Sequence, residues 1–228
     1  LEWDHLAGYE TTKQEIKDTI ILPLKHPEIY DSVARNTRRF KAGNRPRAVL
    51  FEGPPGTGKT TSARIIASKA NAKLVYVPIE SIMTKWYGES SRNLAKIFNR
   101  AHDLGDVILF LDEIDSLAGR REDIHEATRR VLSVLLRKLD GFTPEEKVIT
   151  IGATNRKVDL DPALLRRFEA TINFPLPSVD ERAAIYSVYA KQLKPDEVSK
   201  LASNSEGFSG SDIKNVCVKT ERRWASQL

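Results

Sequence analysis

The chain has 228 residues, with 36 Lys or Arg against 31 Asp or Glu, so its formal net charge is +5. Apolar residues make up 40% of the sequence, which is enough to fill the core of one large globular domain or two small ones and argues against disorder. The longest run without Asp, Glu, Lys or Arg covers residues 170–179, far short of the roughly 20 apolar residues that cross a bilayer.

Short apolar runs alternate along the chain with longer segments of helical periodicity, as a mostly parallel sheet with crossover helices requires. Strands are predicted at residues 48–52, 74–79, 107–112, 148–154 and 171–174. Helices are predicted between them at residues 59–70, 90–104 and 124–139. The third and fourth strands are almost continuously hydrophobic, which predicts central strands covered on both faces.

The pattern changes after the fifth predicted strand, where Pro175 and Pro177 are followed by segments that predict helices only. These helices are expected at about residues 179–193, at 195–203 and from 209 onward. We therefore predict a large α/β subdomain with a parallel five-stranded sheet over residues 1–177 and a small all-α lid over residues 178–228. A truncation of the lid at its C-terminal end is left open. Because the first residue is Leu, we expect any targeting signal or membrane anchor to lie outside this chain.

Residues 53–60 read GPPGTGKT and fit the pattern G-x-x-x-x-G-K-[ST] directly between a predicted strand and a predicted helix. Glycines there let the backbone curl, so that several N–H groups converge on a phosphate at the N-terminus of a helix. We expect Lys59 to reach the β- and γ-phosphates of ATP and the Thr60 hydroxyl to ligate Mg²⁺. The predicted nucleotide-binding residues are Gly53, Pro54, Pro55, Gly56, Thr57, Gly58, Lys59, Thr60 and Thr61. The alternative is an ordinary Gly/Pro turn, but the full match in this context favours a P-loop NTPase fold.

Two acidic residues, Asp112 and Glu113, end the hydrophobic third strand. This position places them at the carboxyl edge of the predicted sheet, beside the phosphate loop. We expect Asp112 to hold Mg²⁺ through water and Glu113 to polarise the attacking water. Acidic residues at a strand end are often only solvated, but here they follow a phosphate loop, which favours the catalytic interpretation.

A third motif is IGATN at residues 151–155, followed by DPALLRRF at residues 161–168. Together the three motifs resemble the AAA family of ATPases, and the likeness runs from Trp3 to the last residues. The resemblance implies that Asn155 is the first sensor, because an amide can both donate to a γ-phosphate oxygen and accept from the lytic water. It also implies that Arg166 and Arg167 are paired arginine fingers, which reach the γ-phosphate of a neighbouring subunit. For Arg167 alone, a basic cap on a short helix is the alternative.

Two further segments resemble the parts of the family that surround the adenine. HLAG at residues 5–8 is similar to the family's N-terminal segment, and the resemblance implies that Ala7 and Gly8 approach the base. GFSGSD at residues 207–212 resembles the second-sensor region, without the arginine of other AAA+ proteins. We expect Gly210 and Ser211 to border the nucleotide, although Ser209 or Ser211 could instead be only a helix cap.

The segment KWYGES at residues 85–90 falls where the family places its first pore loop. Two adjacent aromatic side chains in a central channel can grip a polypeptide without sequence preference. The resemblance therefore implies that Trp86 and Tyr87 bind polypeptide substrates. The alternative for either aromatic is a side chain folded back on the sheet.

The sequence KWYGES resembles the corresponding segment of the AAA ATPases that extract membrane proteins from the mitochondrial outer membrane and the peroxisome. The other motifs agree nearly as well with spastin, fidgetin and katanin, which sever microtubules, and with the ATPase that disassembles ESCRT filaments. The basic stretch FKAGNRPR at residues 40–47 and Thr61, in place of an aliphatic residue, depart from the branch pattern.

We therefore expect an enzyme that hydrolyses ATP with Mg²⁺ in a nucleotide-dependent homohexamer and threads polypeptides through its pore, with membrane-protein quality control as the leading role. Microtubule severing or disassembly of protein complexes is the alternative within the family. A nucleotide-gated scaffold or binding module is the alternative of another class. A nucleic-acid motor is less favoured, because the basic residues are spread along the chain without a recognisable reading element.

The single cysteine, Cys217, lies at helical spacing among apolar residues, so we expect a core thiol in a protein of a reducing compartment. The expected location is intracellular, with the cytosolic face of the mitochondrial outer membrane or another organelle as a candidate. Membrane association is expected only through segments outside this chain.

Overall fold

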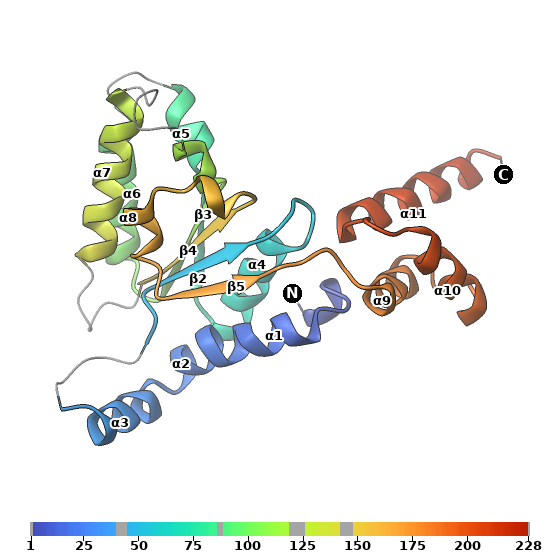
Figure 1. Ribbon diagram of the computed structural model, residues 1–228, viewed down its shortest axis with the longest axis horizontal. Helices are drawn as coiled ribbons and strands as arrows, with labels where there is room; N and C mark the ends of the chain where they lie inside the picture. The colour runs from blue at the N-terminus through green and yellow to red at the C-terminus, as the bar shows by residue number, and fades with distance from the viewer. Residues whose placement is uncertain (1, 40–44, 86–88, 119–125, 142–147, 228) are drawn as a thin grey trace.

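The computed structural model describes residues 2–39, 45–85, 89–118, 126–141 and 148–227. Its centre is a parallel sheet with the strand order β2-β3-β4-β1-β5 (Figure 1). The strands are β1 (Ala48–Glu52), β2 (Lys73–Pro78), β3 (Val107–Asp112), β4 (Val148–Thr154) and β5 (Ala170–Asn173). β4 is buried along its whole length and β3 up to its last residue, which confirms that the third and fourth strands are central and covered on both faces.

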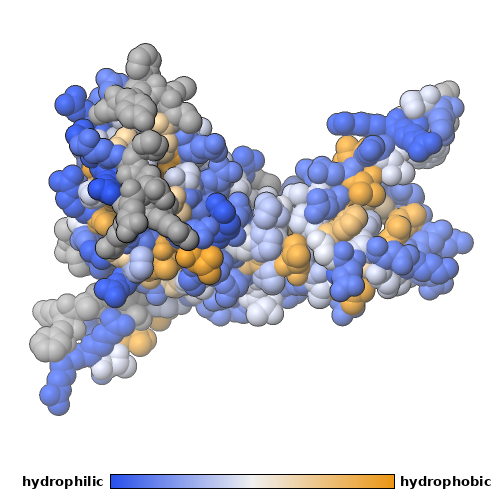
Figure 2. All heavy atoms as spheres, turned by 45° about the horizontal axis from the view of Figure 1, so that its top comes forward, coloured by the Kyte–Doolittle hydropathy of each residue, from blue (hydrophilic) through white to orange (hydrophobic). Residues whose placement is uncertain are grey.

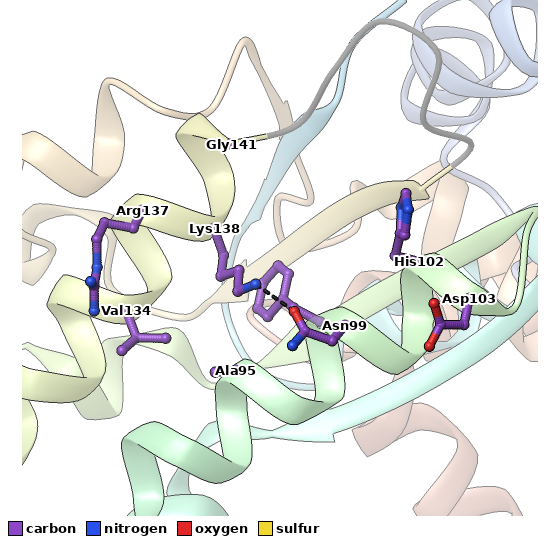
Figure 3. Close-up of a pocket in the computed structure, with 9 residues that line it drawn as sticks. Ala95, Asn99, His102, Asp103, Val134, Arg137, Lys138 and Gly141 are labelled. Carbon is purple, nitrogen blue, oxygen red and sulfur yellow. Dashed lines mark hydrogen bonds between the residues drawn. The ribbon is translucent and has the colours of Figure 1, made fainter.

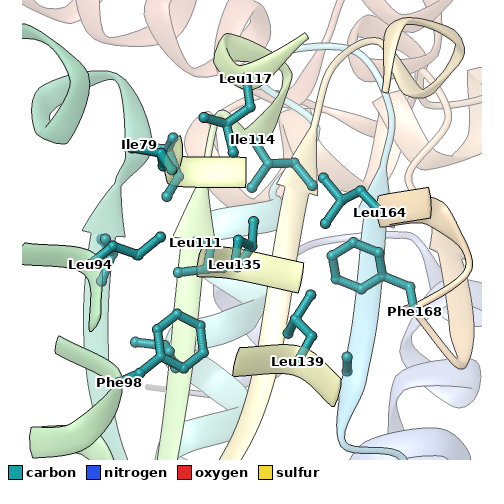
Figure 4. Close-up of a cluster of buried hydrophobic side chains, with 14 of the residues drawn as sticks. Ile79, Leu94, Phe98, Leu111, Ile114, Leu117, Leu135, Leu139, Leu164 and Phe168 are labelled. Atoms are coloured by element: carbon teal, nitrogen blue, oxygen red, sulfur yellow. The ribbon is translucent and has the colours of Figure 1, made fainter. Parts of the chain in front are cut away.

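One face of the sheet is covered by α5 (Ile79–Lys85), α6 (Ser90–Asp103), α7 (Glu126–Asp140) and α8 (Pro162–Leu165). Figure 4 shows apolar side chains from these helices converging on β3 and its neighbours. The opposite face is covered by α4 (Lys59–Ala70), α1 (Glu10–Ile16) and the π-helical turn η2 (Lys17–Ile21). α2 (Leu22–Lys25) and α3 (Pro27–Thr37) continue from η2 toward one corner of the molecule (Figure 1). Short 3₁₀ turns complete this part at η1 (Trp3–His5), η3 (Ile114–Leu117) and η4 (Lys157–Asp159).

Three helices follow β5 and lie at the end of the molecule away from α6 and α7 (Figure 1). They are α9 (Val179–Tyr189), α10 (Pro195–Asn204) and α11 (Gly210–Ala225). Capping boxes begin two of them, because Ser178 and Ser209 each accept a hydrogen bond from the backbone three residues on. Arg182 of α9 is 7% exposed and ties α9 to α10 and to the segment before α9, since its guanidinium donates to the carbonyls of Ala202 and Pro177, each over 2.9 Å. Cys217 is buried among them, as expected.

The N-terminal segment fills the space between the sheet and α9. Leu6 and Tyr9 belong to the same apolar core as α9, α10 and α11. The Tyr9 hydroxyl donates to the carbonyl of Pro175 over 2.9 Å, and the Tyr9 N–H donates to Glu181 Oε1 over 3.0 Å. The division into residues 1–177 and 178–228 stays a prediction, and these contacts show that the first residues of the chain are shared between both parts.

Most of the face drawn in Figure 2 is hydrophilic, and hydrophobic residues gather there in small groups, several of them over the C-terminal helices. Five large apolar residues on or beside those helices are more than a third exposed: Val179, Val188, Leu201, Val216 and Trp224. Among the helices of the described residues, none combines the length and the apolar character that a bilayer crossing requires.

Candidate nucleotide-binding site

The loop between β1 and α4 forms a tight curl in which the backbone of Phe174 and the side chain of Leu6 approach glycines closely. A Cβ atom on Gly53 would lie 2.1 Å from the carbonyl oxygen of Phe174, and one on Gly58 would lie 2.3 Å from Leu6 Cδ1. Gly58 also has a φ of +98°, in the left-handed region that favours glycine. Pro55 is exposed and Thr57 is buried, with its hydroxyl donating to the carbonyl of Pro54 over 2.8 Å. The loop therefore has the shape predicted for a phosphate cradle at the N-terminus of α4.

Lys59 lies under this loop. Its Nζ donates to the carbonyls of Gly53 and Pro54 over 2.6 and 2.8 Å. Burial lowers the pKa of Lys59 to about 8, while the nearby carboxylates of Asp112 and Asp115 oppose that shift. The ammonium group is thus held at the loop by two carbonyl oxygens, within reach of an anion that the loop would bind.

Asp112 ends β3 beside the first turn of α4. Its Oδ2 accepts hydrogen bonds from the hydroxyls of Thr60, over 3.2 Å, and Tyr76, over 2.9 Å. Its Oδ1 accepts from the N–H of Glu113 over 3.0 Å. The two residues predicted to hold a metal, Thr60 and Asp112, are therefore close enough to serve one metal ion.

Glu113 follows Asp112 with a φ of +55°, which is unusual for a residue with a side chain. Its carboxylate is exposed at the carboxyl edge of the sheet. Partial burial, the charge of Asp112 and a hydrogen bond with Glu80 raise the pKa of Glu113 above its ordinary value. A carboxylate with a raised pKa accepts a proton more readily, which suits a general base.

Asn155 follows β4, and its backbone N–H donates to Asp115 Oδ1 over 3.2 Å. The Thr154 hydroxyl donates to the same oxygen over 2.8 Å. Asp115 therefore ties the end of β4 to the turn after β3, so that Asn155 and Glu113 lie on neighbouring strand ends. No role was predicted for Asp115, although its position two residues after the acidic pair was a usable signal.

The two predicted arginine fingers differ in their surroundings. Arg167 forms a two-pronged ion pair with Asp140 at the end of α7, with Nε–Oδ1 and Nη2–Oδ2 distances of 2.9 and 2.8 Å. Its Nη1 also donates to the carbonyl of Ala163 over 3.2 Å, and the bond to Asp140 raises the pKa of Arg167. Arg166 is exposed, and its guanidinium has no bond to any other part of the chain that the structure describes. Within the described part of one chain, Arg167 is bound to Asp140, whereas the Arg166 guanidinium is available for a contact with another molecule.

A cavity of about 120 Å³ lies between the phosphate loop, the N-terminal segment and the C-terminal helices; we call it the lid-side cavity. Its lining residues are His5, Leu6, Ala7, Tyr9, Gly56, Thr57, Gly58, Thr61, Ile185, Tyr189, Gly210, Ser211 and Lys214. The Ser211 N–H donates to the Gly56 carbonyl over 3.1 Å, which joins α11 to the phosphate loop. Ser209 caps α11, whereas Ser211 lines the cavity, so the two serines have different roles.

All but one of the residues predicted to lie near the adenine line this cavity. Ala7, Gly210 and Ser211 line it, whereas Gly8 does not and instead packs against Glu181, where a Cβ atom would lie 2.9 Å from Glu181 Cβ. Thr61, predicted with the phosphate loop, lines the cavity as well. Two of the lining residues that were not predicted from the sequence lie near each other: Lys214 Nζ is 5.9 Å from the centroid of the Tyr189 ring. No motif marks either one, because α9 and α11 come together only in the fold.

Two of the predicted site residues lie outside the described residues. Trp86 and Tyr87, the predicted substrate-binding pair, follow the end of α5 at Lys85, and Glu89 follows them. Their role in substrate binding stays a prediction.

A second, larger cavity of about 640 Å³ lies between α6 and α7 (Figure 3). Its walls carry Asn99, His102, Asp103, Arg137 and Lys138, and Lys138 Nζ donates to Asn99 Oδ1 over 2.5 Å. None of the predicted site residues lines it.

The fold and the site define a P-loop nucleotide-binding protein. A sequence model of the ATPase family associated with various cellular activities (AAA) matches residues 49–176. The crystal structure of the FIGL-1 AAA domain in complex with ADP is similar, with a TM-score of 0.81 and 30% identity over 96% of this chain and 72% of that chain. The chain belongs to the AAA family of ATPases.

Longer relatives contain a similar segment. The chain is 39% identical over 226 residues to a cell division cycle protein 48 homolog from Archaeoglobus fulgidus, covering 95% of this chain and 30% of that protein. It is also 39% identical over 226 residues to a proteasome-activating nucleotidase from Saccharolobus islandicus, covering 95% of this chain and 56% of that protein. The chain thus spans between 30% and 56% of the length of these curated relatives.

Proposed function

We propose that this chain hydrolyses ATP with Mg²⁺ as its metal cofactor. The observation that carries the proposal is the 3.2 Å contact between the Thr60 hydroxyl and the Asp112 carboxylate, beside the loop that holds Lys59. Hydroxyl and carboxylate oxygens are hard ligands of the kind that Mg²⁺ takes, and Mg²⁺ is usually held by few protein oxygens together with water and substrate phosphates. The residues present therefore fit the metal.

In the proposed reaction, the Lys59 ammonium binds phosphate oxygens in addition to its two carbonyl partners. Mg²⁺, when bound, supplies positive charge against the phosphates. Glu113 accepts the proton of the attacking water, and its raised pKa favours that transfer. Asn155 orients the water with its side-chain amide, from a backbone held by Asp115.

We further propose that the active form is a nucleotide-dependent homohexamer in which Arg166 contacts the γ-phosphate bound to the neighbouring subunit. Support comes from the exposed Arg166 guanidinium, which has no partner among the described residues of its own chain. A planar cation at that place would stabilise the charge that develops in the transition state. The exposed apolar residues of the C-terminal helices (Figure 2) are candidates for contacts between subunits.

The proposed work of the hexamer is to thread polypeptides past Trp86 and Tyr87, in membrane-protein quality control on the cytosolic face of the mitochondrial outer membrane or another organelle. The name of the proteasome-activating nucleotidase supports action on proteins, and its segment is 39% identical to this chain. Microtubule severing or disassembly of protein complexes is the alternative within the family. Membrane attachment would need segments outside this chain, and no direct contact with nucleic acid is proposed.

The enzymatic proposal is tested by phosphate release from ATP with Mg²⁺ and with EDTA, using the wild type and Glu113→Gln. We expect turnover only with Mg²⁺ and a loss of about 10²- to 10⁴-fold for the variant, which still binds nucleotide. A variant that turns over like the wild type would remove Glu113 from its role. A wild type that binds ATP but never hydrolyses it, at any protein concentration, would favour the scaffold alternative.

The substrate class is tested by trapping. Glu113→Gln in the full-length protein should hold ATP and substrate together, and mass spectrometry of what co-purifies identifies the substrate. Recovery of membrane proteins supports extraction, whereas recovery of tubulin or filament subunits would replace it with severing or disassembly.

A further inference from the structure

Tyr76 reaches the site although no sequence motif marks it. It lies on the edge strand β2, opposite Phe110 of β3 in the parallel register. Its ring stacks on the Phe110 ring, with centroids 6.0 Å apart and an angle of 18° between the planes. Tyr76 keeps 49% of its surface exposed, so water could satisfy its hydroxyl, yet the hydroxyl donates to Asp112 Oδ2 over 2.9 Å.

Three donors hold the Asp112 carboxylate in one orientation. Glu113 holds Oδ1 through its backbone N–H, and the hydroxyls of Thr60 and Tyr76 share Oδ2. Thr60 belongs to the phosphate loop and Glu113 to the acidic pair, so each has another role in the proposed site. Among the residues that the structure describes, the Tyr76 hydroxyl bonds only to the Asp112 carboxylate, and its ring is fixed by the stack on Phe110.

We propose that Tyr76 is a positioning residue, which holds the Asp112 carboxylate in the orientation needed for a Mg²⁺–nucleotide complex bound at Thr60. This inference rests on the proposed Mg²⁺ dependence. A hydrogen bond from a neutral hydroxyl to a carboxylate is stronger than one between neutral groups, because the acceptor carries a full charge. When the Thr60 hydroxyl oxygen serves a metal, Tyr76 still restrains the carboxylate by a donor that is not itself a ligand.

The inference predicts that removing the Tyr76 hydroxyl weakens metal-dependent binding and leaves metal-free binding unchanged. Tyr76→Phe keeps the ring on Phe110 and deletes only the donor. It is compared in the non-hydrolysing Glu113→Gln background, with the whole 228-residue chain. The readout is the affinity for fluorescent N-methylanthraniloyl-ATP, measured across a Mg²⁺ titration and in EDTA.

We expect Tyr76→Phe to lower the affinity for the probe in Mg²⁺ by about three- to tenfold and to raise the half-saturating Mg²⁺ concentration by a similar factor. The affinity in EDTA should match that of the parent, which also shows that the variant folds. The matched control is Tyr30→Phe on α3, whose hydroxyl is 3.4 Å from the Asp18 carbonyl and outside the site. The control should behave like the parent in both conditions.

Two results would overturn the inference alone. One is an unchanged Mg²⁺ titration for Tyr76→Phe in a parent whose binding depends on Mg²⁺. The other is an equal loss of affinity with Mg²⁺ and with EDTA, since that would mean a general structural role. A parent that binds the probe equally well with and without Mg²⁺ would overturn the proposed metal site and this inference together.

Discussion

Arg182→Met should destabilise the C-terminal helices. The substitution keeps a long unbranched stem in a position that is 7% exposed and removes the donors to the carbonyls of Ala202 and Pro177. A hydrogen bond to a charged group contributes about 1.5–3 kcal/mol, and some relaxation is expected, so we estimate a loss of about 2–4 kcal/mol in the free energy of unfolding. For a chain of this size, that corresponds to a fall in Tm of about 4–16 °C.

The assay is thermal melting with and without saturating nucleotide. Because α9 lines the lid-side cavity, loosening it should also weaken nucleotide binding, and bound nucleotide should restore part of the lost Tm. The matched control is Arg222→Met, an exposed arginine on α11, for which we expect a free-energy change within about 0.5 kcal/mol. If Arg182→Met melts at the same temperature as the control and the wild type, Arg182 is not the tie between α9 and α10.

Three further substitutions separate the roles of the site residues. Lys59→Met removes an ammonium whose pKa burial lowers to about 8, so we expect an unchanged or higher Tm without nucleotide, and an affinity for ATP at least about tenfold weaker in a binding titration. An equal affinity would show that the loop backbone alone binds the phosphates. Arg166→Ala should abolish the rise in turnover per subunit with protein concentration, whereas nucleotide affinity stays the same; a normal rise would remove Arg166 from the interface. Asp140→Ala releases Arg167 from its ion pair, and the displaced finger segment should slow turnover by up to about a hundredfold. Faster turnover would instead mean that Asp140 restrains Arg167 from acting as a second finger.

Local sequence patterns predicted the sheet well, because each strand is a short apolar run that ends at a turn or a motif. β1, β3 and β4 have the predicted bounds, as does α4. β2 is displaced by one residue at each end, since Ile79 is the first residue of α5 and is buried against the neighbouring helices. α9 ends at Tyr189, before the predicted residue 193, and nothing in the local sequence marks that end until Pro195. Residues 124 and 125 of the helix predicted at 124–139 lie outside the described residues.

The N-terminal helices were not predicted, because Pro23 and Pro27 interrupt the helical period and a π-helical turn separates α1 from α2. The motif residues of the site follow from spacing alone. The residues that contact these motif residues cannot be predicted from spacing, because each of them lies on a different helix or strand. Tyr76 meets Asp112 through strand register, and Asp140 meets Arg167 because α7 and α8 pack together. A single sequence contains no signal for such pairs unless a motif names both members.

Leu6 and Tyr9 complete the core of helices that are formed nearly two hundred residues later in the chain. An expressed fragment that starts after Tyr9 would therefore have an unfilled apolar cavity under α9. Low stability of such a fragment would come from its N-terminal boundary and not from its C-terminal boundary. The same arrangement makes the lid-side cavity a junction between both ends of this chain. A polypeptide joined ahead of Trp3 would begin close to His5, which lines that cavity. Binding of a nucleotide in the cavity would then act directly on the start of the joined polypeptide.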